Sequence, residues 1–346
     1  MLERSSGGGG LGAYGEPVRA GSGAEQAVLG DAGMSATQPA AVAYVALAVE
    51  DTEQASAALA GPLGLRRTLL ESEADGPVTA FAVGASAVAL FPLGHALLGE
   101  GGSSAGVHHL ALASADPEAA AAATGLPRTG GPARGLAGRR AVAIEPSATE
   151  GVRLRYSEPL ELEPTAAPLV ERIDHLGVAS ADTAAAVALF HDRLGFPLES
   201  RQTDREVHVP IESFTSDKYG VVYHSRAPLQ RGALEVAFVT VGDFELEFLC
   251  DADAVAAAGK RSGSEAGSTQ QDRGAISRFV ERRGPGLHHL ALKTPAMEAA
   301  LQALREAGVP LIDEAGRPGS RRAQIAFLER EALGGVVMHL VEREPL

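Results

Sequence analysis

The fold is decided by residues 286–292, which read GLHHLAL. Residues 106–112 repeat this stretch closely as GVHHLAL, and each copy is followed by a polar residue and an alanine-rich segment. The same pattern of strand, cap and helix recurs at 173–180 and, in a more diverged form, at 43–49. A pattern that recurs along a chain is typical of a repeat architecture. The sequence therefore predicts four copies of one module.

Each module is predicted to contain one strand, one helix and about three further strands. A polar residue that can cap a helix follows the first strand of every copy: Asp51, Asp116, Asp182 and Thr294. Alternating apolar residues then predict strands in the last two copies at 206–211, 219–226, 234–250, 323–328 and 335–342. Because a single module leaves one face of its sheet uncovered, modules should pair. The expected fold is α+β, with four βαβββ modules paired into an N-terminal domain (39–163) and a C-terminal domain (169–346).

Composition excludes several classes of function. The chain has 346 residues, of which 45% are hydrophobic, enough for two cores. Its formal net charge of −14 makes nucleic acid an unexpected partner and disfavours an anionic membrane surface. No apolar stretch reaches the roughly 18 residues of a membrane helix, and the single cysteine, Cys250, favours a cytoplasmic protein. Residues 1–38, which include four consecutive glycines, are expected to form a flexible arm.

Comparing the two halves identifies one set of side chains suited to metal binding. The C-terminal half carries a possible ligand at each of four positions: His175, Glu247, His289 and His339. At the matching positions the N-terminal half carries Tyr44, Ala89, His109 and Arg155. Imidazole and carboxylate groups together bind Zn²⁺, Fe²⁺, Ni²⁺, Co²⁺ or Mn²⁺. The sequence predicts one divalent ion per chain, with Zn²⁺ favoured, in the C-terminal half alone.

Strand alternation predicts which neighbouring side chains face this site. His289 is expected to face it, whereas His288 is expected to lie on the opposite, bulky side that meets the helix. Glu247 is predicted to point toward the concave side of the sheet. In the last strand, His339 is predicted to be the ligand, with Glu342 on the other face.

These paired modules, with ligands on their first and last strands, resemble the vicinal oxygen chelate superfamily. That superfamily includes glyoxalase I, methylmalonyl-CoA epimerase, extradiol dioxygenases and 4-hydroxyphenylpyruvate dioxygenase. The resemblance covers about residues 40–344, and stretches 275–289 and 325–342 look most like methylmalonyl-CoA epimerase. It implies the same four metal ligands. His339 departs from the family pattern, which usually has a glutamate there that often doubles as a catalytic base.

The resemblance also implies the chemistry. The four-module arrangement is similar both to 4-hydroxyphenylpyruvate dioxygenase and to the cyclitol epimerases that act on 2-epi-5-epi-valiolone. Epimerisation through a metal-stabilised enolate needs an acid/base group on each face of the enolate. Glu247 is expected to supply one, and Glu212 or His224 the other, with Tyr223 in a hydrogen bond to a substrate hydroxyl. The sequence therefore predicts a metal-dependent epimerase of a polyhydroxy cyclic ketone, with a CoA thioester as the second substrate class.

Two other functions remain open. His175, His289 and Glu247 could form the facial ligand set of a non-haem Fe²⁺ dioxygenase. A module of this kind could also bind a small molecule without turnover. Open sheet edges commonly pair, so a homodimer is expected in each case.

Overall fold

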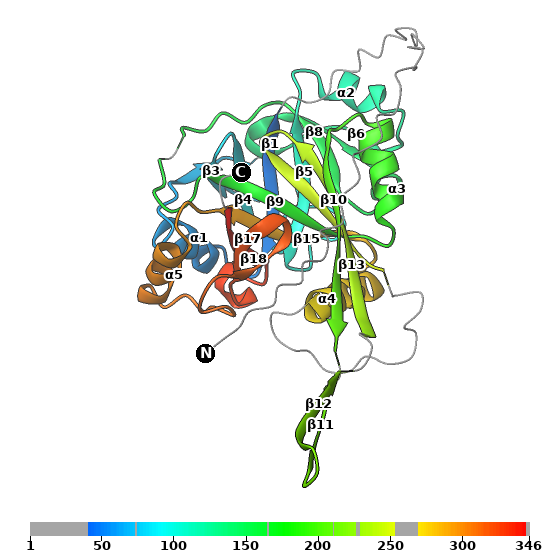
Figure 1. Ribbon diagram of the computed structural model, residues 1–346. Coiled ribbons are helices and arrows are strands. Elements are labelled where there is room, and N and C mark those ends of the chain that lie inside the picture. The colour runs from blue at the N-terminus through cyan, green and yellow to red at the C-terminus, as the bar shows by residue number, and fades with distance from the viewer. Residues whose placement is uncertain are drawn as a thin grey trace, which may run out of the picture. The chain divides into compact units, whose positions relative to one another are not determined.

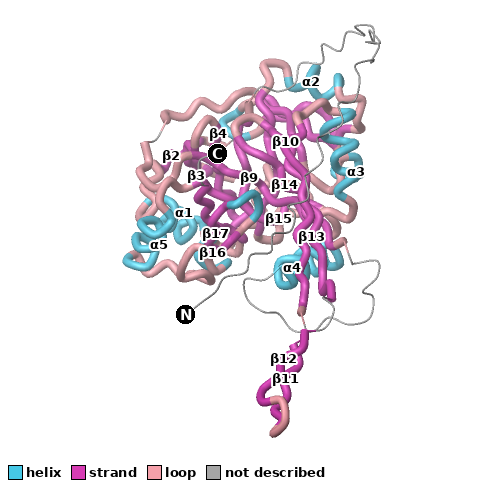
Figure 2. The backbone as a smooth tube through the Cα atoms, viewed as in Figure 1, coloured by secondary structure: helices cyan, strands magenta, loops and turns pink. Residues whose placement is uncertain are grey.

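The computed structural model describes residues 41–72, 75–164, 166–209, 211–225, 229–252 and 269–343 (Figure 1). The predicted arm at 1–38 lies outside these residues. Within them, the strands form two eight-stranded sheets and a separate two-stranded ribbon. More of the described backbone lies in strands than in helices (Figure 2). The predicted α+β fold of paired βαβββ modules is confirmed.

The first sheet is formed by the first two modules, in the order β2-β3-β4-β1-β5-β8-β7-β6. Its strands are β1 (Val42–Val49), β2 (Arg67–Leu70), β3 (Val78–Val83), β4 (Ser86–Pro92), β5 (Gly106–Ala113), β6 (Arg128–Arg134), β7 (Arg140–Ile144) and β8 (Leu154–Ser157). The helices of these modules are α1 (Thr52–Ala60) and α2 (Pro117–Ala123), with short turns η1 (Leu136–Gly138) and η2 (Pro146–Ala148).

The second sheet is formed by the last two modules, in the corresponding order β10-β13-β14-β9-β15-β18-β17-β16. Its strands are β9 (Arg172–Ala179), β10 (Leu198–His208), β13 (Leu229–Val241), β14 (Phe244–Asp251), β15 (Gly286–Lys293), β16 (Arg317–Pro318), β17 (Ala323–Phe327) and β18 (Val337–Arg343). The helices are α3 (Thr183–Val187), continued by the turn η3 (Ala188–Arg193), α4 (Thr269–Arg283) and α5 (Met297–Glu306), with short turns η4 (Ser320–Arg322) and η5 (Arg330–Leu333). Helix α4 is an addition to the repeated module, between β14 and β15.

The strands of the third module differ from those predicted. The predicted strand 219–226 falls on an inserted ribbon, β11 (Ile211–Ser216) paired with β12 (Gly220–Ser225). The predicted strand 206–211 instead covers the end of β10 and only the first residue of β11, and β10 pairs directly with β13. The expected strand 234–250 is two strands that turn at Gly242, whose φ is +63°. The prediction was wrong here because apolar alternation is the same in an inserted hairpin as in a sheet strand. In the sequence, the Gly242-Asp243 pair indicates a tight turn, and it joins β13 to β14.

Three of the four predicted helix caps are confirmed. The Asp51, Asp116 and Asp182 carboxylates accept from backbone N–H groups two or three residues later, at 2.8 to 3.1 Å. Thr294 is not the cap of α5, because the residue before this helix is Ala296. Instead the Glu342 carboxylate, from β18, accepts from the N–H of Met297 at 2.7 Å. Glu342 therefore lies on the helix side of its strand, as predicted.

Contacts join the two halves within the compact unit of residues 37–346. The Asp243 carboxylate accepts from the N–H of Ala85 at 3.0 Å, and the N–H of Glu50 donates to the carbonyl of Gly334 at 2.9 Å. The proposed domain limits of 39–163 and 169–346 stay a prediction. None of the helices in the described part of the chain has the length and hydropathy of a membrane span.

Candidate metal centre

The four predicted ligands lie on the four central strands of the second sheet. Glu247, His175, His289 and His339 stand on β14, β9, β15 and β18, which are hydrogen-bonded neighbours in that order. All four are buried, with 3 to 5% of each residue exposed. The backbone register also confirms the matching of the halves, because Ala291 pairs with both His175 and His339 as Ala111 pairs with Tyr44 and Arg155.

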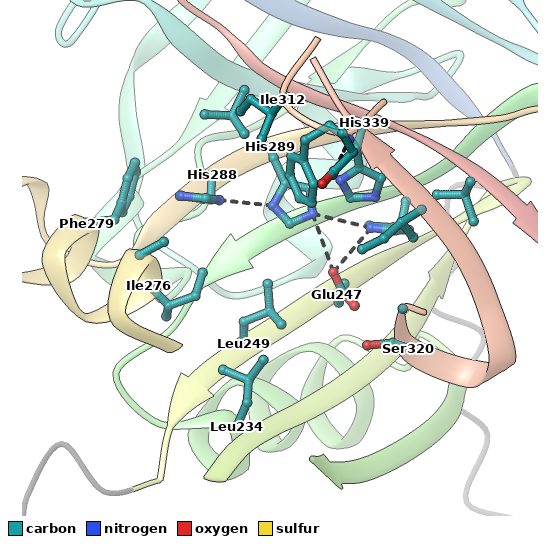
Figure 3. Close-up of a pocket in the computed structure, with 18 of the residues that line it drawn as sticks. Leu234, Glu247, Leu249, Ile276, Phe279, His288, His289, Ile312, Ser320 and His339 are labelled. Carbon is teal, nitrogen blue, oxygen red and sulfur yellow. Dashed lines mark hydrogen bonds and ion pairs between the residues drawn. The ribbon is translucent and has the colours of Figure 1, made fainter. Parts of the chain in front are cut away.

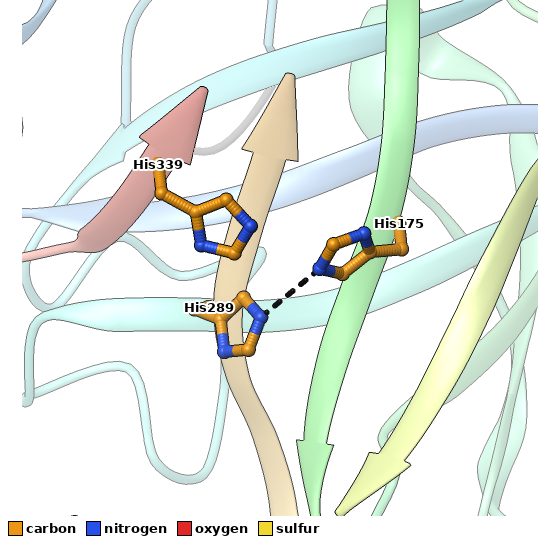
Figure 4. Close-up of side chains that lie close together, drawn as sticks. All are labelled: His175, His289 and His339. Atoms are coloured by element: carbon orange, nitrogen blue, oxygen red, sulfur yellow. Dashed lines mark hydrogen bonds between the residues drawn. The ribbon is translucent and has the colours of Figure 1, made fainter. Parts of the chain in front are cut away.

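Their polar atoms converge on one point. Nε2 of His175 lies 3.3 Å from Nε2 of His289, and Oε2 of Glu247 lies 3.2 Å and 3.4 Å from these two nitrogens (Figure 3). Figure 4 shows the rings of His175, His289 and His339 turned toward one another from three strands. One nitrogen from each ring lies within 4.8 Å of the other two. The structure therefore gathers the predicted ligands.

The spacing and the chemistry of these donors fit a metal ion. Ligand atoms held tetrahedrally at about 2.1 Å from a zinc ion are about 3.4 Å apart, close to the separations among His175, His289 and Glu247. Both ring nitrogens of His339 are buried and have no hydrogen-bond partner among the described residues. A buried imidazole without partners is costly unless it binds something. A divalent ion would satisfy His339 and neutralise the Glu247 carboxylate at once.

A second layer of hydrogen bonds orients His175. Its Nδ1 lies 2.7 Å from Oδ1 of Asp174, and Nε of Arg343 donates to Oδ2 of the same carboxylate at 2.9 Å. Neighbouring residues on a strand normally point to opposite faces, but a β-bulge at Asp174 turns both side chains to one side. A carboxylate behind a ligand histidine is the usual way to fix its ring and strengthen its basicity.

The prediction that His288 points away from the site was wrong. The register of β15 on β9 shifts between Leu287 and His289, so His288 sits in a bulge and lines the cavity. Its Nδ1 lies 2.9 Å from Nδ1 of His289, and its ring packs edge-on against Phe279 at 5.0 Å between centroids. Burial lowers the pKa of His288 to about 3, aided by the charges of His289, Arg330 and Arg283. His288 is therefore a neutral support for His289.

The carboxylates give the cluster an affinity for positive charge. Burial disfavours charged His175, but Glu247 and Asp174 outweigh burial and raise its pKa to about 9. Burial also disfavours charged Glu247, yet His175 and His289 hold the pKa of this carboxyl well below its usual range. The cluster thus stabilises a cation, and a divalent ion would replace the proton on His175.

The closeness of these side chains depends on a glycine. Gly177 pairs with both His289 and Glu247, and a Cβ added to it would lie 2.0 Å from Cε1 of His289. Only a residue without a side chain lets this imidazole lie flat over the central strand. The first half has Ala46 at the equivalent position.

The cluster lines a cavity of about 850 Å³. One wall comes from α4, with Ile276 and Phe279, and another from β17, with Phe327. Thr203 and Ser320 also line the cavity. The volume is that of a small-molecule site.

Asp204 is a cavity residue that strand patterns did not reveal. It lies on β10, and Nε2 of Gln202 donates to its two oxygens at 3.0 and 3.2 Å. Burial raises the pKa of Asp204, the hydrogen bond from Gln202 lowers it, and the charge of Glu247 raises it further. A carboxylate with a raised pKa in a cleft is suited to proton transfer. The sequence did not single out Asp204, because β10 is largely polar and also carries Glu199 and Glu206.

The structure does not bring Glu212 to this cavity. Glu212 is exposed on the inserted ribbon, where its backbone pairs with that of His224. Tyr223 on the same ribbon is 73% exposed. The His224 side chain lies outside the described part of the structure.

The equivalent position in the first half is filled by a cation from the chain itself. Arg155 donates to the carbonyls of Leu97 and Leu98 at 2.6 and 3.1 Å, and His109 Nε2 lies 3.3 Å from the hydroxyl of Tyr44. Burial, together with the charge of Arg155, lowers the pKa of His109. With Ala89 in place of a carboxylate, this half offers a positive charge where the other half offers a ligand.

Comparisons with known proteins agree with this architecture. Residues 174–327 match the model of the Glyoxalase/Bleomycin resistance protein/Dioxygenase superfamily. The chain is 25% identical over 173 residues to "Uncharacterized protein YqjC" of Bacillus subtilis (strain 168), a match that covers 50% of this chain and 93% of that protein. A mutant 4-hydroxymandelate synthase from Streptomyces coelicolor is similar in structure, with a TM-score of 0.58, 15% identity, and coverage of 89% of this chain and 94% of that one.

A methylmalonyl-CoA epimerase from Mycobacterium tuberculosis is 26% identical, with a TM-score of 0.35, and covers 52% of this chain and 93% of that one. The family match supports the glyoxalase/vicinal oxygen chelate superfamily for the C-terminal half, and the likeness of nearly the whole chain to the synthase shows the two-domain fold.

Proposed function

We propose that this protein is a metal-dependent epimerase, an isomerase that inverts a carbon next to a ketone. The observation that carries the proposal is the buried cluster of His175, Glu247, His289 and His339 on one wall of a cavity of small-molecule size. The unpartnered nitrogens of His339 support metal binding in particular. Zn²⁺ is the favoured ion, because the spacing of the donors suits a four-ligand site.

The four residues of the cluster would hold the ion. A divalent ion bound there supplies Lewis-acid stabilisation of the negative charge that develops on a carbonyl oxygen. The apolar walls formed by Ile276, Phe279 and Phe327 limit the access of water to the reacting carbon.

Two carboxylates of the chain are proposed to move the proton. Epimerisation needs one group to take the proton from carbon and another to return a proton to the opposite face. Glu247 remains the first candidate, as the sequence predicts. We assign Asp204 as the second, because it lines the cavity, whereas Glu212 lies on the ribbon outside it.

The favoured substrate is a polyhydroxy cyclic ketone of the 2-epi-5-epi-valiolone type, with a CoA thioester as the alternative. Hydroxyl groups of such a ring would meet Thr203 and Ser320, and its carbon face would meet Phe327.

The test is solvent deuterium exchange with the metal-loaded protein and candidate ketones, followed by NMR. The proposal expects exchange at the carbon next to the carbonyl, lost in Asp204→Asn and in His339→Ala, with Asp116→Asn as the control. Exchange at the same rate in Asp204→Asn would contradict the role of Asp204. No exchange with any ketone, in a protein that does bind metal, would contradict epimerase activity.

A second candidate is a non-haem Fe²⁺ dioxygenase. It is favoured by the mutual contacts of His175, His289 and Glu247, which form a two-histidine, one-carboxylate set. Oxygen consumption by the Fe²⁺-loaded protein in place of deuterium exchange would favour this function, and ligand binding with neither activity would favour a binding protein.

We also propose a homodimer. Exposed apolar side chains on the inserted ribbon support it: Ile211, Phe214, Val221 and Tyr223 are 49 to 73% exposed. An isolated two-stranded ribbon is only marginally stable in water. Light scattering should give twice the chain mass, and a monomer at micromolar concentration would contradict the dimer.

A further inference from the structure

The cavity is basic although the chain as a whole is acidic. The net charge is −14, yet arginines of α4 and of two other elements line the cavity: Arg205, Arg278, Arg282, Arg283 and Arg330. Two more arginines there are paired with carboxylates, Arg317 with Asp313 and Arg343 with Asp174. Within the described residues, no ion pair joins the first five to a carboxylate. Excess positive charge is therefore concentrated in this cavity.

Two of these guanidinium groups are held in place from different elements. Arg283, at the end of α4, donates through one terminal NH group to the carbonyl of Ala105 at 3.1 Å, and it lies 5.7 Å from the ring centre of Phe279. Arg330, on η5, donates through Nε and a terminal NH group to the carbonyl of Gly335 at 3.2 and 2.9 Å. Each keeps further N–H donors for a ligand.

Both arginines act close to the metal cluster. Phe279 packs on His288, whose Nδ1 lies 2.9 Å from Nδ1 of His289, so Arg283 is connected to the cluster through two ring contacts. The backbone groups that bind the two arginines also lie close together, because a Cβ added to Gly335 would lie 2.6 Å from Cβ of Ala105. A ligand that reaches the metal with one end can therefore meet these arginines with the other.

We propose that Arg283 and Arg330, with Arg282 on the same helix, form a phosphate-binding subsite, and that the ketone processed at the metal carries a phosphate group. Several guanidinium groups without carboxylate partners match the two negative charges and multiple acceptor oxygens of a phosphate. The substrate assignment rests on the proposed function, whereas phosphate binding by the subsite does not require turnover.

The experiment is a titration of the metal-loaded full chain with inorganic phosphate at constant ionic strength, followed by calorimetry and ³¹P NMR. The expected result is saturable binding at one site that weakens at least about tenfold in Arg283→Gln and in Arg330→Gln, since each loses charge-assisted hydrogen bonds. Arg66→Gln, an exposed arginine outside the cavity, should bind like the parent. Arg282→Gln, which disturbs no backbone contact, keeps the test valid if the other variants fold poorly.

Absence of saturable binding, or equal binding by all the arginine variants, would overturn the subsite. Tighter binding of acetate than of phosphate would overturn the choice of phosphate. Coenzyme A binding that loses affinity in the same variants would support phosphate recognition and identify a thioester as its source, whereas a small phosphorylated ketone that competes with inorganic phosphate would identify a phosphate monoester. His339→Ala should lose metal but still bind phosphate, which separates failure of this inference from failure of the proposed function.

Discussion

At the scale of single residues, the metal centre depends on small differences between two similar halves. Gly177, Glu247 and His339 stand where the first half has Ala46, Ala89 and Arg155. Each difference has a physical effect. Gly177 leaves room for an imidazole, Glu247 adds a negative charge, and His339 is a neutral ligand in place of a cation.

Gly177→Ala should weaken metal binding. The new Cβ would overlap the His289 ring, which lies 2.0 Å from that position, and the ring would have to leave the cluster. We expect a loss of affinity of about 10- to 100-fold, the effect of disturbing a ligand's support. Competition with a chromogenic chelator measures it. Gly131→Ala, where a Cβ meets nothing within 4 Å, is the control, and unchanged affinity in Gly177→Ala would contradict the geometry.

Asp174→Asn should also weaken metal binding. The substitution keeps the shape but removes the charge that His175 Nδ1 and Arg343 share. An affinity lower by about 10- to 100-fold is expected, with Asp116→Asn, a helix cap that asparagine serves equally well, as the control. If Asp174→Asn binds metal as tightly as the parent, the carboxylate has no role in orienting His175.

His108 should make the fold sensitive to acid. Burial, together with the charge of Arg153, lowers its folded pKa to about 4, against about 6.5 unfolded. Because the unfolded state binds the proton more tightly, the free energy of unfolding falls as pH drops through this window. Between pH 7 and pH 5, His108 should lower the free energy of unfolding by about 2 kcal/mol. Urea unfolding should show a smaller pH dependence for His108→Gln, and an equal dependence would contradict the assignment.

At the scale of elements, the sequence repeat at 106–112 and 286–292 made most of the site predictable. Four copies in one register are enough to match Glu247 with Ala89 and His339 with Arg155, because a repeat that pairs its strands in the same way must superpose. The bulges at Asp174 and His288 were not predictable, since alternation assumes an unbroken ladder. The arginines that α4 places in the cavity were not predicted, because the net charge of −14 averages over the whole chain.

The inserted ribbon should be dispensable for metal binding. Strands β10 and β13 pair up to His208 and Leu229, so an Asn-Gly turn in place of residues 209–228 would close them directly. We expect this variant to keep its metal, because β11 and β12 belong to a separate sheet. Retained exchange activity would exclude Glu212 and His224 as proton carriers, whereas loss of activity with metal retained would support their predicted role. Loss of metal would contradict the separation of ribbon and sheet.

At the scale of the whole molecule, two sheets with the same strand order have different chemistry at the same place. The first half fills its position with Arg155, bonded to backbone carbonyls, while in the second half His339 has no hydrogen-bond partner in the described part of the chain. This asymmetry makes the second half the expected site of metal binding and leaves the first half a structural role.

The decisive measurement is the metal content of purified protein, determined by elemental analysis in parent and variants. We expect one divalent ion per chain in the parent, retained in His109→Ala and lost in His175→Ala, Glu247→Ala, His289→Ala and His339→Ala, with folding of each variant checked by circular dichroism. A parent that binds no ion after reconstitution, or ligand variants that fold and keep their metal, would contradict this expectation.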